Sequence, residues 1–83
     1  MHPQAIKQLL ETHLADTTAF IEGEDGRHYS AIVISPLFAG KNRVQKQQLV
    51  YTALGNHIAD GTIHAISIKT FTPDEWREHN KES

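Results

Sequence analysis

Apolar residues recur at helical spacing in the first part of this 83-residue chain. Ile6, Leu9, Leu10 and Leu14 are separated by the steps of one, three and four residues that place side chains on one helix face. Pro3 suits the first turn of a helix, where its missing N–H would have no partner. The pattern therefore predicts a helix from about Pro3 to Leu14.

Two segments rich in strand formers follow, at Asp16–Glu22 and Tyr29–Ser35. Between them stands Gly23-Glu24-Asp25-Gly26, a sequence typical of a tight turn. Pro36 ends the second strand because proline cannot donate to a β-ladder. The two strands joined by this turn predict a β-hairpin.

A second, longer helix is predicted from Asn42 to about Ile58, with Gly61 as a left-handed cap. Gln47 falls inside its apolar stripe, where an amide needs a hydrogen-bond partner. The residues expected to form that stripe are Val44, Val50, Tyr51, Leu54 and Ile58.

The third strand is predicted at Ile63–Thr70, with side chains alternating between two faces. Thr72-Pro73-Asp74-Glu75 then reads as a capping box with proline at the first helical position. Trp76 is the expected anchor of this last helix. We expect one domain over residues 1–80 and a frayed tail over residues 81–83.

The predicted order is helix, strand, strand, helix, strand, helix. A helix between the second and third strands favours a parallel pairing through a right-handed crossover. The fold class expected is α+β, a three-stranded mixed sheet with helices packed on one face.

Composition limits the chemistry that this chain can carry. The net charge of −2 argues against a uniformly basic nucleic-acid surface, and no stretch approaches the length of a membrane span. No secretion signal is visible, so we expect a cytoplasmic protein that does not associate with membranes. The absence of cysteine excludes a self-contained thiolate metal site.

His28 and His64 are the two histidines that stand near predicted strand ends. Each is either a surface or core-edge residue or a metal ligand, and any metal would be shared with a partner that brings sulfur. Asp25 and His28 could form an acid–base pair, although loop carboxylates are usually solvated. No nucleophilic cysteine, Gly-x-Ser-x-Gly motif or phosphate loop is present, so we expect no enzymatic activity.

Lys41, Arg43 and Lys46 form a basic stretch at the start of the second predicted helix. They could be a solvated helix start, or they could contact an acidic partner or a nucleic-acid backbone.

Three ordered motifs resemble the BolA family, and they look like its IbaG (YrbA) bacterial subgroup. The first is Ser35-Pro36-Leu37-Phe38-Ala39-Gly40-Lys41, the second is Gln45-Lys46-Gln47-Gln48-Leu49-Val50-Tyr51, and the third runs from Ile63 to Trp76. The resemblance covers nearly the whole chain. It implies an αββαβα arrangement similar to class II KH domains.

The resemblance also implies a function, as an adaptor in iron–sulfur trafficking or in iron, redox and stress regulation. A monothiol glutaredoxin and its glutathione would share a [2Fe–2S] cluster with this chain, which alone would be a monomer that binds no cluster. His64 maps onto the family's C-terminal histidine ligand. A second ligand is expected from the hairpin loop, where Asp25 stands near the family's Cys or His and where His28 is the histidine in reach.

Two further points come with the resemblance. Relatives often carry His-Arg where this chain has Gln47-Gln48. The alternative function is a DNA-binding transcriptional regulator. Gly23 and Gly26 have the spacing of the KH loop, but they lie in an acidic turn that would repel phosphate.

Overall fold

The computed structural model describes residues 1–23, 25, 27–63 and 65–81. The predicted order of helices and strands is confirmed. The elements are α1 (Pro3–His13), β1 (Thr18–Glu22), β2 (His28–Ile34), the 3₁₀ helix η1 (Pro36–Phe38), α2 (Arg43–Leu54), the 3₁₀ helix η2 (Gly55–His57), β3 (Ala65–Phe71) and α3 (Pro73–Lys81). The last helix thus extends to Lys81, one residue into the predicted tail.

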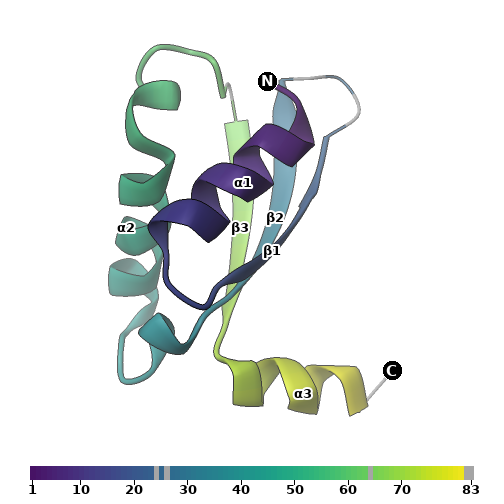
Figure 1. The fold of residues 1–83 in the computed structure, drawn as a ribbon, viewed down its shortest axis with the longest axis vertical. Helices are drawn as coiled ribbons and strands as arrows, with labels where there is room; N and C mark the ends of the chain where they lie inside the picture. Colours follow the sequence, from purple (N-terminus) through teal and green to yellow (C-terminus); the bar gives the residue numbers. More distant parts are fainter. Residues whose placement is uncertain (24, 26, 64, 82–83) are drawn as a thin grey trace.

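The three strands form one mixed sheet in the order β1-β2-β3. β1 and β2 pair antiparallel, with Thr18 opposite Ile34, which confirms the predicted hairpin. β2 and β3 pair parallel, with His28 opposite Ala65, which confirms the crossover through α2 (Figure 1). The α+β fold class is therefore confirmed.

The hydrophobic core lies between one face of the sheet and the layer of α1 and α2. Tyr29, Ala31 and Val33 alternate inward along β2, as the period of a strand requires. The buried residues of the core are Ile6, Leu10, Leu14, Ala19, Tyr29, Ala31, Val33, Phe38, Val50, Ala53, Leu54 and Ile63.

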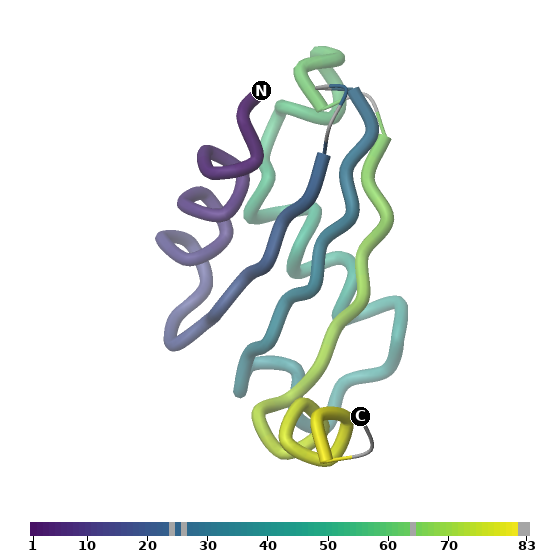
Figure 2. Tube along the Cα trace, turned by 90° about the vertical axis from the view of Figure 1, so that its right-hand side faces the viewer, coloured from purple at the N-terminus to yellow at the C-terminus, as the bar shows by residue number. Residues whose placement is uncertain are grey.

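The third helix departs from the expectation that helices pack on one face. Trp76 stacks on Phe20 with ring centroids 5.9 Å apart and meets Phe71 edge-on at 5.2 Å. Phe20 follows the fully buried Ala19 in β1, so its side chain points to the opposite face of the sheet. α3 therefore contacts the sheet on the face opposite the α1–α2 layer, at the end where β3 finishes (Figure 2). Trp76 is its anchor, as predicted.

The second helix also differs from its prediction in length and in orientation. It ends at Leu54, because Gly55 takes a positive φ of 63° and caps it. Its buried residues are Val50, Ala53 and Leu54, whereas Val44 is 65% exposed and Tyr51 is 42% exposed. Val44 lies six positions before Val50, about 120° away around the helix axis, so it cannot face the same core. The predicted stripe was wrong at Val44, Tyr51 and Ile58.

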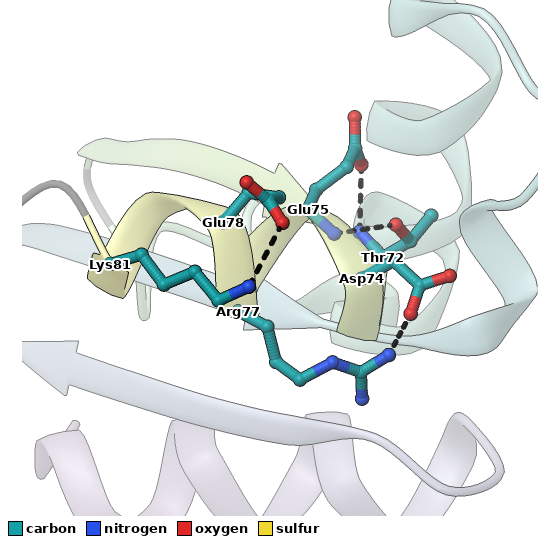
Figure 3. Close-up of polar contacts among 6 residues, drawn as sticks. All are labelled: Thr72, Asp74, Glu75, Arg77, Glu78 and Lys81. Carbon is teal, nitrogen blue, oxygen red and sulfur yellow. Dashed lines mark hydrogen bonds and ion pairs between the residues drawn. The ribbon is translucent and has the colours of Figure 1, made fainter.

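The capping box at the start of α3 is confirmed. Glu75 N–H donates to Thr72 Oγ1 at 3.2 Å, and Thr72 N–H donates to Glu75 Oε1 at 2.8 Å (Figure 3). Together these bonds satisfy two backbone donors that a helix start leaves without partners. This local motif fixes where the chain turns out of β3.

Candidate functional site

His28 stands at the start of β2, and Asp25 of the preceding turn holds its ring. His28 Nδ1 lies 2.8 Å from Asp25 Oδ2, and the other carboxylate oxygen accepts from the backbone N–H groups of Arg27 and His28. The His28 side chain is 63% exposed. The imidazole is thus oriented by a carboxylate while its ring remains open to solvent.

These hydrogen bonds act on the carboxylate as well. The bond to the His28 ring, followed by those to the backbone amides of His28 and Arg27, holds the pKa of Asp25 far below its ordinary value of 3.8. Asp25 is therefore a carboxylate at neutral pH. The sequence left open whether Asp25 and His28 form a pair, and in the structure their side chains are in hydrogen-bond contact.

The parallel register places the start of β3 beside His28. Ala65 is the register partner of His28, and Ala65 N–H donates to the Arg27 carbonyl at 3.0 Å. An open pocket of about 340 Å³ lies here, lined by His28, Tyr29, Ser30, Ala65, Ile66 and Ser67. His64, the predicted C-terminal ligand, lies outside the described residues, and its role stays a prediction.

Gly23 allows the hairpin to close against the core at this site. A Cβ at residue 23 would lie 2.8 Å from Tyr29 Cε1 and still closer to Cδ1. Tyr29 is buried, and its hydroxyl donates to the Met1 carbonyl. The ring therefore has little room to move, and only glycine fits.

The basic stretch at the start of α2 divides between two surfaces. Arg43 and Lys46 line a groove of about 380 Å³ together with Lys69 of β3. Lys41 instead lines a separate pocket with Gln45 and Gln48. Sequence reasoning missed Lys69, because only the crossover brings β3 beside α2. Whether these cations contact a partner stays a prediction.

Other described histidines have local roles. His2 Nδ1 accepts from Gln4 N–H at the start of α1, His13 Nδ1 lies 2.9 Å from the Leu9 carbonyl, and His79 stacks on Trp76. His57 Nδ1 is buried, and none of the described residues forms a hydrogen bond with it. Within the described ranges, no three His, Cys, Asp or Glu residues gather as a metal site.

The fold and the motifs define the class of protein: the chain belongs to the BolA-like family. The family's profile, described as BolA-like protein, matches residues 2–75. A solved BolA homologue from Coxiella burnetii superimposes with a TM-score of 0.84 at 42% identity, covering 93% of this chain and 97% of that one. The BolA domain of SufE1 from Arabidopsis thaliana gives a TM-score of 0.76 at 30% identity, covering 88% and 93%.

Within the family, the chain belongs to the IbaG-like subgroup. It is 42% identical over 81 residues to the acid stress protein IbaG of Escherichia coli strain K12, which covers 98% of this chain and 95% of the relative. That name describes a stress protein, and the expected lack of enzymatic activity stays a prediction. None of the helices in the described ranges has the length and apolarity needed to cross a membrane.

Proposed function

We propose that this chain is an adaptor that binds a monothiol glutaredoxin and shares a bridging [2Fe–2S] cluster with it. The observation that carries the proposal is the Asp25–His28 pair beside the start of β3. Membership of the BolA-like family supports it.

The chemistry of His28 fits a cluster ligand. A metal-binding histidine commonly gives its other ring nitrogen to a carboxylate, which fixes the tautomer and the ring orientation. Asp25 already holds Nδ1 in this way, so Nε2 is the nitrogen that would bind iron. Asp25 itself acts as the orienting group, because a carboxylate is a poor match for a soft iron–sulfide cluster.

His64 is the second ligand in this proposal. It directly precedes Ala65, the register partner of His28. The sulfur donors come from the glutaredoxin and its glutathione, since this sequence contains no cysteine. A cluster with imidazole on one iron is less negative and has a higher reduction potential than an all-thiolate cluster.

Visible circular dichroism tests the proposal. Reconstituted [2Fe–2S] monothiol glutaredoxin, with glutathione, is titrated with the wild-type chain and with His28→Ala and His64→Ala. We expect a new spectrum with the wild type that is lost or changed in each variant. Asp25→Asn should weaken the complex about 10- to 100-fold, as expected for a residue that orients a ligand.

His13→Ala is the matched control. His13 ends α1, an 11-residue helix that spans about 16 Å, so it stands far from the pocket that begins near Met1. Its variant should give the wild-type spectrum. An unchanged glutaredoxin spectrum with the wild type, or the same spectrum with both ligand variants, would set the adaptor function aside.

A further inference from the structure

The outer edge of β3 and the start of α2 together form a groove with two kinds of binding group. β3 is at the edge of the described sheet, so one side of its backbone has no neighbouring strand. The groove of about 380 Å³ runs along this side and is lined by Ile68, Lys69, Thr70 and Phe71, with Arg43, Lys46 and Gln47 on α2. Such a volume lies within the range of pockets that hold ligands.

The register shows which backbone groups face this groove. Ala65 N–H donates to Arg27 and Phe71 C=O accepts from Ser35, so residues 65 and 71 direct their peptide groups toward β2. Successive residues of a parallel strand alternate in this respect. Ile66, Ile68 and Thr70 therefore direct their N–H and C=O groups to the outer edge.

The groove is also cationic. Arg43, Lys46 and Lys69 line it, and the Lys46 side chain is only 18% exposed. The ion pair of Lys46 in the structure is with Glu75, at 3.9 Å, which is near the outer limit of such a contact. A second carboxylate near this partly buried ammonium group would stabilise its charged form, because Glu75 is a distant counterion.

We propose that this groove binds an extended acidic segment of a partner protein, which adds to β3 as a further strand. The backbone of the segment would pair with Ile68 and Thr70, and its carboxylates would meet Arg43 and Lys46. Strand addition draws affinity from main-chain hydrogen bonds and specificity from alternate side chains. This binding does not depend on the cluster or on His28.

The backbone of β3 favours a peptide over single-stranded nucleic acid. The row of outward N–H and C=O groups on β3 matches the backbone of another strand. A phosphodiester backbone carries no N–H donor for the C=O groups of this row, so it cannot pair with β3 as a strand does.

Fluorescence anisotropy with a labelled peptide of alternating Glu and Val tests the proposal. Its partner probe has the same sequence with alternate backbone nitrogens methylated, which keeps the charge and removes strand pairing. We expect the unmethylated peptide to bind and the methylated one to bind at least about tenfold more weakly. Hydrogen exchange of the Ile68 and Thr70 amides should slow on binding, whereas that of Lys69 should not change.

The double variant Arg43→Gln/Lys46→Gln should weaken binding roughly five- to tenfold. Lys41→Gln is its matched control, because Lys41 has the same charge but lines another pocket. Equal binding of the methylated and unmethylated peptides would refute strand addition. Absence of peptide binding would overturn the peptide proposal. An oligothymidine that binds more tightly than the peptide, and whose binding the double variant abolishes, would overturn it in favour of nucleic acid.

Discussion

Gly23→Ala tests whether close packing against Tyr29 holds the loop that carries Asp25 and His28. The added methyl group would lie 2.8 Å from Tyr29 Cε1 and 3.1 Å from the His28 carbonyl oxygen. Real Cβ atoms do not approach a ring carbon this closely, so either the ring or the loop must shift. Tyr29 is 3% exposed and is held at its hydroxyl by Met1, so the backbone at residue 23 is the part that must move away.

The size of the effect follows from the cost of overpacking. One methyl group forced into a packed site costs about 1–3 kcal/mol. The free energy of unfolding of a domain this size is about 4–12 kcal/mol. In such a domain, each kcal/mol shifts Tm by about 4–8 °C, so we expect Tm to fall by about 4–24 °C.

Thermal unfolding and urea denaturation, both followed by circular dichroism, measure this loss. The control is a double-mutant cycle with Tyr29→Leu, which removes the ring that the methyl group would strike. In that background, Gly23→Ala should cost markedly less, because the two residues are coupled. An equal cost with and without the Tyr29 ring, or no cost at all, would refute the packing argument.

Three further predictions concern stability. Trp76→Leu removes ring contacts with Phe20 and Phe71, so it should lower the free energy of unfolding by about 1–3 kcal/mol in urea denaturation. Tyr51→Leu, on the exposed face of α2, is the control and should change this free energy by less than about 0.5 kcal/mol. Equal losses in the two variants would contradict the anchoring role of Trp76. Thr72→Ala should cost about 1 kcal/mol in the same assay through loss of the α3 cap, and an unchanged urea midpoint would argue against the cap. The Lys7 ammonium, and then the Ala19 amide, hold the pKa of Glu11 below 4.5, so its stabilising contribution is complete above the unfolded pKa and is lost as pH falls through the folded pKa. The urea midpoint should therefore drop less on acidification in Glu11→Gln than in the wild type, and parallel curves would exclude this contribution.

Local patterns in the sequence were enough to predict the element order, the hairpin, the crossover and the class of fold. The capping box at Thr72 and the helical spacing of Ile6 and Leu10 depend on residues within one turn of each other. Such interactions act in the same way wherever the segment lies in space. The family resemblance followed from the same local motifs.

The end of α2 and the face that it buries could not be predicted without the tertiary structure. A helical pattern shows which residues share a face, but neighbouring elements decide which face is buried. Here α2 turns Val50 and Leu54 to the core and leaves Val44 and Tyr51 exposed. Gly55 ends the helix by taking a positive φ. The sequence pattern alone does not distinguish a glycine that ends a helix from one that is tolerated inside it.

The candidate sites depended on tertiary structure most of all. Sequence reasoning named His28 and Asp25 as neighbours, but only the folded turn aims the carboxylate at Nδ1 and sets the pair beside Ala65. Likewise, the basic stretch was visible in the sequence, yet Lys69 joins Arg43 and Lys46 only through the parallel register of β3. Contacts between residues distant in the chain arise from packing and register, and no local spacing encodes them.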